Sequence, residues 1–192
     1  HIIVSNVEHP AVKNTAEWLK TQGFEVDFAP VDGDGFVIVS ELEKLIRDET
    51  ILVSIMAVNN EVGTIQPIDE ISDLLADKPT ISFHVDAVQA IGKIPIEAWL
   101  TERVDFAVLS AHKFHGPRGV GIVVAKKGKR LTPLLHGGGQ EHNWRSTTEN
   151  LAGIAATSKA LRLVLDDDDF KRQKVRAMKQ VILEELEKHR KV

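Results

Sequence analysis

The sequence predicts an α/β fold in which a mostly parallel sheet is flanked by helices. Short apolar segments alternate along the chain with segments of helical periodicity, which is the pattern of repeated β-α-β units. One segment, residues 51–58, is almost continuously apolar, as strands covered on both faces are. Polar residues follow several of the apolar segments, and in open parallel sheets ligands bind at the carboxyl ends of the strands.

The first half of the chain is expected to hold four strands with helices between them. The strand-like segments span residues 1–5, 24–28, 51–58 and 81–85. The helical segments span residues 11–21, 40–47, 67–75 and 87–91. Pro10 suits the first position of its helix and Gly23 suits the exit, while Ser40-Glu-Leu-Glu43 matches a capping box.

The second half continues with two strands, glycine-rich loops and two helices. The strands are expected at residues 104–109 and 120–125, followed by a hairpin-like basic turn at 126–130. A helix is expected at residues 151–165. The last helix carries apolar residues at helical spacing, which predicts a packing face; they are Val175, Met178, Ile182 and Leu186.

Composition favours an ordinary globular protein and excludes several classes of function. The chain has 192 residues, 43% of them hydrophobic and 27% charged. A net charge of -4 gives no basic surface for nucleic acid or an anionic membrane. The absence of cysteine excludes a disulfide framework, a cysteine metal site and a thiol nucleophile within these residues. No apolar run approaches the length of a membrane span, so a cytoplasmic protein is expected.

Both ends of the sequence suggest a piece of a longer protein. The chain has no initiating Met and opens directly on the apolar segment His1-Ile-Ile-Val-Ser5. It stops at His189-Arg-Lys-Val192, within a helical pattern that no capping Gly or Pro closes.

A lysine between two apolar strands is the strongest chemical signal. The turn after residues 104–109 carries Ser110, His112 and Lys113. A lysine buried there would need a partner, and an aldehyde is a natural one because it converts the amine into a Schiff base. The alternative is a lysine on a surface loop. Asn60 and Asp86 also follow their own strands directly, which favours a shared ligand site.

A metal-binding scaffold is an alternative of a different class, because the chain has eight histidines. The candidates His115, His136 and His142 lack the close spacing of zinc ligands. His136 opens the loop His136-Gly-Gly-Gly-Gln-Glu141, whose glycines permit close approach of an anion or of another chain.

Taken together, the motifs resemble the cysteine desulfurases of the NifS/IscS type, in the class V aminotransferase group. The resemblance covers essentially the whole chain and keeps the motifs in family order. They are Ser5-Asn-Val-Glu-His-Pro10, Asn59-Asn-Glu-Val-Gly63, His84-Val-Asp-Ala-Val-Gln89, Ser110-Ala-His-Lys113 and His136-Gly-Gly-Gly-Gln-Glu141. The resemblance implies a partial large domain of the aspartate-aminotransferase-like fold type I at residues 1–150. Residues 151–192 would then be a helical connection towards a small C-terminal domain.

The resemblance also assigns roles around pyridoxal 5'-phosphate. Lys113 matches the lysine that binds the cofactor covalently, and Asp86 matches the carboxylate that faces the pyridine nitrogen. His9 matches the histidine that stacks on the ring and carries a proton; it also suits a helix cap before Pro10.

Further residues match cofactor ligands. Asn60 and Gln89 match amides that hydrogen-bond the phenolic oxygen, although both would also suit loop backbone bonding. Ser110 and His112 match phosphate ligands. Thr148 matches a threonine that contacts the cofactor of the other subunit of a homodimer, but Thr147 stands where the family has glycine.

The implied reaction converts L-cysteine to L-alanine and leaves persulfide sulfur on the enzyme for Fe–S cluster or thio-cofactor synthesis. Sulfur-acceptor proteins are then the expected partners. The persulfide forms on a cysteine, and this chain has none, so we expect it to be inactive alone. The alternatives are another class V enzyme, such as a selenocysteine lyase or an aminotransferase, or a stable core without activity.

Overall fold

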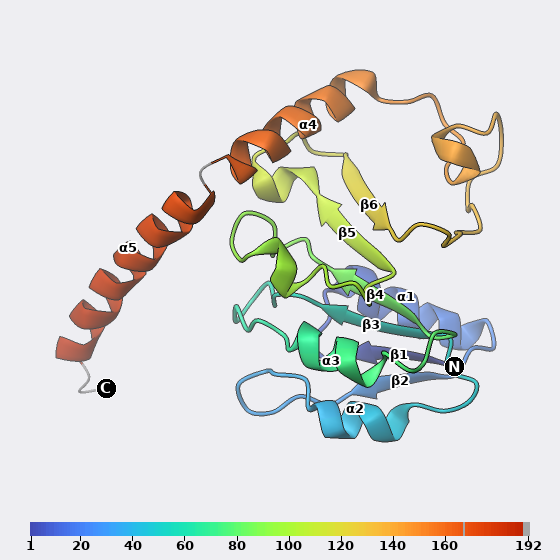
Figure 1. Cartoon of the computed structure of the whole chain (residues 1–192), viewed down its shortest axis with the longest axis horizontal. Helices are drawn as coiled ribbons and strands as arrows, with labels where there is room; N and C mark the ends of the chain where they lie inside the picture. Colours follow the sequence, from blue (N-terminus) through green and yellow to red (C-terminus); the bar gives the residue numbers. More distant parts are fainter. Residues whose placement is uncertain (167, 190–192) are drawn as a thin grey trace.

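The computed structural model of the protein describes residues 1–166 and 168–189. Within them, six strands form one sheet in the order β2-β1-β3-β4-β5-β6 (Figure 1). The strands are β1 (Ile2–Ser5), β2 (Val26–Ala29), β3 (Leu52–Met56), β4 (Ser82–Asp86), β5 (Phe106–Ser110) and β6 (Gly121–Ala125). The first five are parallel and β6 is antiparallel to β5. The predicted fold class is therefore confirmed.

Helices cover both faces of this sheet. The long ones are α1 (Pro10–Thr21), α2 (Val39–Leu45), α3 (Ile68–Leu74), α4 (Leu151–Leu165) and α5 (Asp168–Lys188). Three short 3-10 turns are η1 (Ile96–Ala98), η2 (Ala111–Phe114) and η3 (Glu141–Asn143). Helices α2 and α3 lie on one face of the sheet, and α1 lies on the other (Figure 1).

The alternation of side chains along each strand divides the core between the two faces. In β1, Ile3 joins the large cluster that packs against α2 and α3, whereas Ile2 and Val4 pack against Ala16 of α1. The large cluster is completely buried at the sheet centre, where Phe83 is 0% exposed. This core fixes the strand ends, and with them the edge that carries the predicted ligands.

Two predicted local structures are wrong. The capping box at Ser40 does not form, because α2 begins one residue earlier, with Ile38 at its N-cap and no side-chain cap. Residues 87–91 form hydrogen-bonded turns instead of a helix. The run is too short to nucleate a helix, and Gly92, with a φ of 70°, and then Pro95 redirect the chain.

The C-terminal third agrees with the prediction for α4 and differs from it at the basic turn. Helix α4 has the predicted bounds, and the Asn150 side chain caps it by accepting from the Gly153 amide at 3.0 Å. No strand follows the basic turn at 126–130 in the described residues, so the turn belongs to no hairpin. Residue 167 and residues 190–192, at the predicted chain end, lie outside the described part.

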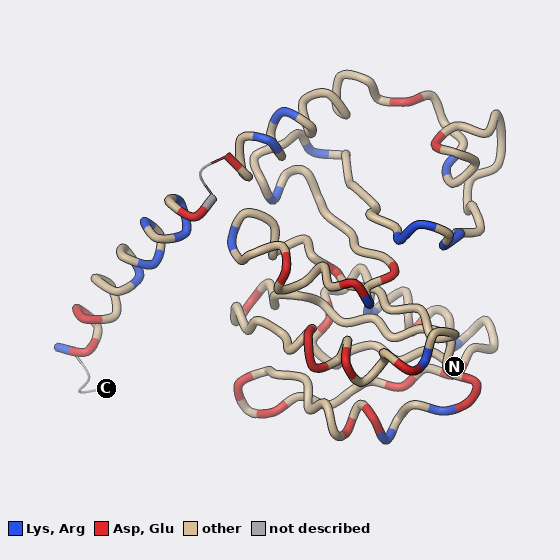
Figure 2. The backbone as a smooth tube through the Cα atoms, viewed as in Figure 1, with Lys and Arg blue, Asp and Glu red and all other residues tan. Residues whose placement is uncertain are grey.

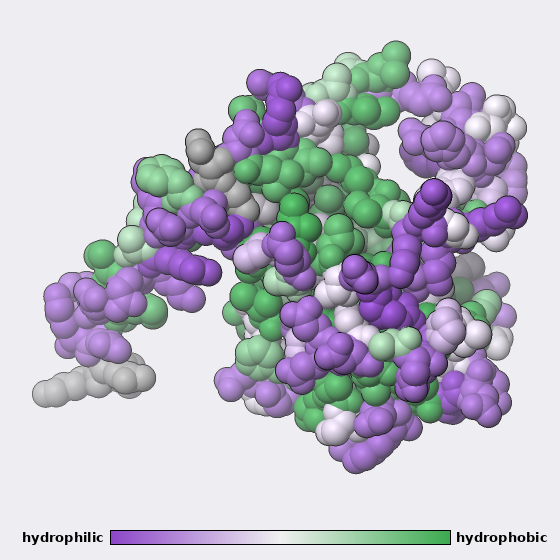
Figure 3. Space-filling view, in the orientation of Figure 1, coloured by the Kyte–Doolittle hydropathy of each residue, from purple (hydrophilic) through white to green (hydrophobic). Residues whose placement is uncertain are grey.

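Helix α5 projects away from the sheet (Figure 1), and charged residues recur along it (Figure 2). Its predicted packing face is exposed: Val175, Met178, Ile182 and Leu186 are 64%, 52%, 59% and 61% accessible. Hydrophobic residues are also exposed along α4 (Figure 3). None of the helices in the described ranges is long and apolar enough to cross a membrane.

Candidate active site

Polar side chains from separate parts of the sequence meet at the carboxyl edge of the sheet. They line a cavity of 530 Å³. Seven of the eight residues predicted for the site are among its lining, namely His9, Asn60, Asp86, Gln89, Ser110, His112 and Lys113. Parallel strands end at the same edge, so the sheet itself brings these residues together.

Lys113 lies in η2, the turn that directly follows β5. It is exposed at the cavity and is not buried, so the prediction that burial singles it out is wrong. The reason is the three-residue period of the turn. Ala111 and Phe114 point into the core, at 0% and 1% exposure, and this directs His112 and Lys113 outwards.

Gly116 secures the turn that presents Lys113. Its amide donates to the Ala111 carbonyl at 2.8 Å. A Cβ added to Gly116 would lie 2.9 Å from that same carbonyl oxygen, so a larger residue would displace the turn. The neighbouring His115 adopts the left-handed region, with a φ of 68°. The close approach to the Ala111 carbonyl explains why position 116, three residues after Lys113, is occupied by glycine.

Asp86 is the last residue of β4 and is 8% exposed. Its Oδ1 accepts a hydrogen bond from the Val88 amide at 3.0 Å. The carboxylate thus caps the turn after the strand and lines the cavity at the same time. A carboxylate held in this way is pre-oriented for a cationic group in the cavity.

His9 combines both of its predicted positions. It is the N-cap of α1, where its Nδ1 accepts from the Ala11 amide at 3.1 Å. It also lines the cavity. With Nδ1 engaged as an acceptor, the neutral ring carries its proton on Nε2.

The two predicted amides differ in what holds them. The loop backbone is bonded by Asn59, whose Nδ2 donates to the Val7 carbonyl and whose Oδ1 accepts from the amides of Glu61 and Val62. Asn60 is therefore left exposed at the cavity. Gln89 accepts from Lys93 through its Oε1 at 2.5 Å, which leaves its NH2 group as the donor for a ligand.

Ser110 and His112 line the cavity on either side of the start of η2. Thr148 does not line it. This residue is exposed and lies between η3 and α4, in the long connection that leads from β6 to α4 (Figure 1). One chain therefore brings seven of the predicted residues together and leaves the eighth apart.

Two ionisable residues in this region were missed by the sequence analysis. His84 precedes Asp86 by two residues on the same face of β4, and its Nδ1 lies 2.8 Å from the Ser54 hydroxyl. Burial lowers the pKa of His84, although the charge of Asp86 opposes the shift. The strand period of two was enough to place His84 beside Asp86.

Glu8 is the second of these residues, and it is 6% exposed. Burial raises its pKa to about 7, and Asp86 adds to the shift, against the hydrogen bonds from Ser5 and Met56. In the sequence, only its position before His9 set it apart. Glu8 and His84 thus both favour their neutral forms around Asp86.

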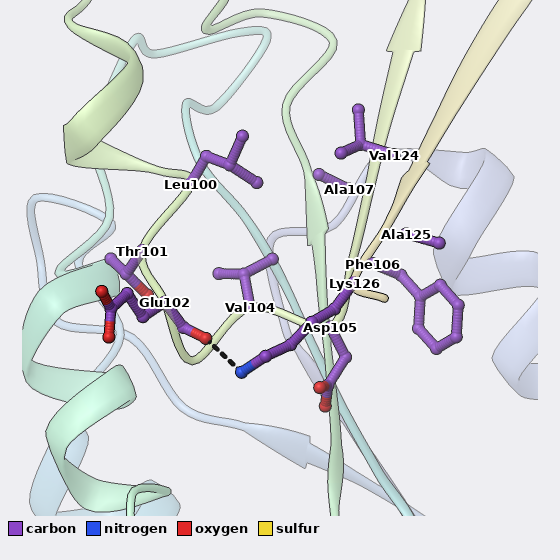
Figure 4. Close-up of a pocket in the computed structure, with 10 residues that line it drawn as sticks. All are labelled: Leu100, Thr101, Glu102, Val104, Asp105, Phe106, Ala107, Val124, Ala125 and Lys126. Atoms are coloured by element: carbon purple, nitrogen blue, oxygen red, sulfur yellow. Dashed lines mark hydrogen bonds between the residues drawn. The ribbon is translucent and has the colours of Figure 1, made fainter. Parts of the chain in front are cut away.

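The opposite edge of the sheet has a cavity with a different lining. A cavity of 280 Å³ lies there, at the start of β5 (Figure 4). Apolar side chains, Leu100 and Val104 among them, supply part of its wall, and Lys126 bonds the Glu102 carbonyl at 2.5 Å. Within the described residues, no three His, Cys, Asp or Glu side chains gather to hold a metal ion.

Comparison with known proteins places the chain in a family. The family model described as aminotransferase class-V matches residues 1–192. This chain belongs to the class-V aminotransferase family. Members of this family are pyridoxal-phosphate enzymes.

Among class-V relatives, a "NifS/IcsS protein homolog" of Lactobacillus delbrueckii subsp. bulgaricus is 54% identical over 182 residues, 95% of this chain and 47% of the relative. A "Cysteine desulfurase IscS" of Clostridium botulinum is 48% identical over 87% of this chain and 42% of the relative. A solved "NIFS-LIKE PROTEIN" aligns with a TM-score of 0.92 at 43% identity, covering 97% of this chain and 51% of that one. The chain thus spans about half the length of these class-V relatives.

Proposed function

We propose that this protein is a pyridoxal-phosphate-dependent cysteine desulfurase. The proposal rests on one observation: Lys113, Asp86 and His9, from three distant segments, line one cavity in a member of the class-V family. Relatives that bear the name cysteine desulfurase support this choice within the family. The proposed substrate is L-cysteine, and the products are L-alanine and sulfur carried as a persulfide.

The donor set of the cavity fits the cofactor. The Lys113 amine suits the aldehyde, the Asp86 carboxylate suits the pyridine nitrogen, and Ser110 and His112 suit the phosphate. The amides of Asn60 and Gln89 suit the phenolic oxygen. When bound, the cofactor supplies an electron-withdrawing ring that weakens the bonds at the substrate α-carbon.

The side chains of this chain then have distinct tasks. Asp86 would keep the pyridine nitrogen of a bound cofactor protonated, because its negative charge favours the cationic form. The Lys113 Nζ moves the proton to and from the substrate α-carbon. His9 would cover a bound cofactor ring, and its Nε2, which the cap hydrogen bond leaves free, would supply a proton there.

The sulfur-accepting thiolate has to come from outside these residues, since the chain contains no cysteine. We propose that Thr148 contacts the cofactor of a second copy in a homodimer, in keeping with its absence from the lining of the cavity in its own chain. Sulfur-acceptor proteins for Fe–S cluster or thio-cofactor synthesis are the proposed partners, and the cytoplasm is the proposed compartment.

Cofactor titration tests the assignment of Lys113. Adding pyridoxal 5'-phosphate to the chain should produce an absorbance band near the visible edge, shifted from that of the free aldehyde. Lys113→Ala should abolish the shifted band. The matched control Lys127→Ala removes an exposed lysine outside the cavity and should retain it. A band that survives in Lys113→Ala, or its absence from the unaltered chain at saturating cofactor, would refute the assignment.

The chain alone should not release sulfide catalytically. Incubation with cofactor, L-cysteine and a reductant should give sulfide no faster than a blank that contains cofactor but no protein, because no thiolate is available to take the sulfur. Multiple turnovers above that blank would contradict the proposal that the reaction needs a cysteine thiolate from outside these residues.

A further inference from the structure

Glu8 is a buried carboxyl that the proposed chemistry does not use. It lies between the end of β1 and the start of α1, at 6% exposure. Carboxyl groups are rarely buried without a partner that compensates the charge. No cation pairs with it among the described ion pairs. Its burial therefore calls for another explanation.

The contacts of Glu8 are asymmetric between its two oxygens. Its Oε1 accepts from the Ser5 hydroxyl at 2.5 Å and from the Met56 amide at 2.7 Å. Its Oε2 is buried without a hydrogen-bond partner among the described residues. A carboxylate in this place would keep an unsolvated charge on an unpaired oxygen, whereas a proton on Oε2 removes that charge.

The groups packed around Glu8 provide no positive charge to compensate. Asp86, from the end of β4, is the ionisable residue whose charge acts on Glu8, and it opposes ionisation. Strand β3 presents the Met56 amide, and the following loop presents the neutral Asn59 side chain, bonded to the Val7 carbonyl. His9 is the next residue of the chain. Burial and the charge of Asp86 therefore favour the neutral acid, and together they outweigh the hydrogen bonds from Ser5 and Met56, which favour the ionised form.

The two bonds of Oε1 tie the end of β1 to the end of β3. Ser5 is the last residue of β1 and Met56 the last of β3, so the Glu8 carboxyl joins two adjacent strand ends. His9 follows directly. The backbone position of His9 relative to Asp86 thus depends on how firmly Glu8 is held.

We propose that Glu8 is a positioning residue of the cofactor site, a neutral carboxyl that fixes where His9 stands relative to Asp86 without adding a second negative charge beside it. This inference rests on the proposed function, because the geometry it protects is that of the cofactor cavity. Glu8 is not among the residues that line the cavity, so its proposed effect is exerted through His9 and Asp86.

The protonation state of Glu8 can be measured without cofactor. The infrared difference between the unaltered chain and Glu8→Gln should contain the carbonyl band of a protonated carboxylic acid at mildly acidic pH, and this band should vanish at mildly alkaline pH. Ser5→Ala removes a hydrogen bond that favours the ionised form. It should therefore shift the midpoint of that loss to higher pH.

Cofactor affinity tests the positioning role. Glu8→Gln keeps an acceptor in place of Oε1 and stays neutral, so its affinity for pyridoxal 5'-phosphate should remain within about threefold of the unaltered chain. Glu8→Ala removes both bonds and should bind about tenfold more weakly, as expected for one lost buried anchor. The control Glu17→Gln changes an exposed carboxyl on α1 and should bind normally.

Each outcome decides the proposal. An ionised Glu8 at mildly acidic pH, an unmoved midpoint in Ser5→Ala, or normal cofactor binding by folded Glu8→Ala would overturn it. Should Glu8→Ala fail to fold, the infrared midpoints and the affinity of Glu8→Gln still decide. If the unaltered chain binds no cofactor, both the proposed function and the positioning role of Glu8 are refuted. The infrared titration decides separately whether the Glu8 carboxyl is neutral.

Discussion

At the scale of single residues, the carboxyl edge of the sheet holds an acid, Glu8, and a base, His84, whose burial favours the uncharged form of each side chain. Burial raises the pKa of Glu8 to about 7 and lowers that of His84. Both residues interact with Asp86, which raises the pKa of each. At mildly acidic pH Glu8 is therefore neutral, whereas a carboxyl with an ordinary pKa would be ionised. The edge is therefore built to offer a ligand one carboxylate, Asp86, in low-polarity surroundings.

The titration of Glu8 should appear in the pH dependence of stability. Its pKa is about 7 in the folded chain, against an ordinary value of 4.5. Between these values the folded chain binds more protons than the unfolded chain, so the free energy of unfolding falls as pH rises from 4.5 to about 7. The contribution is complete below that window and lost above it. The size is on the order of 3 kcal/mol, because one pKa unit corresponds to about 1.4 kcal/mol.

Urea unfolding of the unaltered chain and of Glu8→Gln, at several pH values across this window, measures the effect. The difference between their unfolding free energies should decrease with rising pH, since glutamine does not titrate. His84 has the opposite slope, as its lowered pKa makes the fold more stable when pH rises. It is present in both proteins and cancels in the difference. A difference that is flat, or that grows with pH, would show that Glu8 is ionised in the folded chain.

Sequence reasoning placed the residue types of the site well and their environments poorly. Asp86 was predictable because it ends an apolar strand, and strand ends converge in a parallel sheet. The exposure of Lys113 was not, because it depends on η2 turning Ala111 and Phe114 inwards. Glu8 escaped notice because its burial results from contacts with Met56, which lies 48 residues away in the sequence.

At the scale of elements, the joints between strands and helices were the hardest to predict. The strands and α4 follow from apolar patterns whose burial the whole sheet enforces. Residues 87–91 have apolar spacing compatible with a helix, but the Asp86 carboxylate and Gly92 select a turn. A side chain that accepts a hydrogen bond from a nearby backbone amide can favour a turn over a helix, and the residue type alone does not predict which of the two forms.

Arg103 illustrates how such joints are stabilised at the edge opposite the site. Its guanidinium donates to the carbonyls of Leu75, Lys78 and Ile81, in the segment between α3 and β4. It also bonds the Asp105 carboxylate at 2.9 Å, close to the cavity shown in Figure 4. Burial alone would raise the pKa of Asp105, but hydrogen bonds from the Phe83 amide, Lys129 and Arg103 hold it below its ordinary value.

Replacing Arg103 by Ala should destabilise the fold by about 2 kcal/mol, because it removes hydrogen bonds to three carbonyl groups and a cationic partner of the buried Asp105 carboxylate, which keeps its contact with Lys129. The matched control is Arg47→Ala. Arg47 pairs with Glu25 and Asp27 but is 40% exposed, and such surface pairs contribute about 1 kcal/mol or less. Urea unfolding at neutral pH compares the two. Equal losses in both variants would mean that Arg103 is no more than a surface ion pair.

At the scale of the whole molecule, one compact sheet carries the site while α5 stands apart from it. The sheet and its covering helices bury apolar residues of the inner strands, although Val123 of β6 is 51% exposed. The cavity is lined by strand ends, by the loops that follow them and by the start of α1. Helix α5 instead leaves Val175, Met178, Ile182 and Leu186 accessible. A contiguous apolar face of this kind, rimmed by charged residues, is typical of an interaction surface.

We therefore expect this chain to self-associate through α5. The unaltered chain should show a sedimentation coefficient that rises with protein concentration. The double variant Met178→Lys with Ile182→Lys places two charges one helical turn apart on the apolar face and should lose the part of this association that depends on α5, so that its sedimentation coefficient rises less over the same range. The matched control, Val62→Lys with Leu134→Lys, changes two other exposed apolar residues, 72% and 94% accessible, and should still associate. Far-ultraviolet circular dichroism should be unchanged in both variants. A concentration-independent monomer for the unaltered chain would mean that the charges along α5 suffice to keep this face in water.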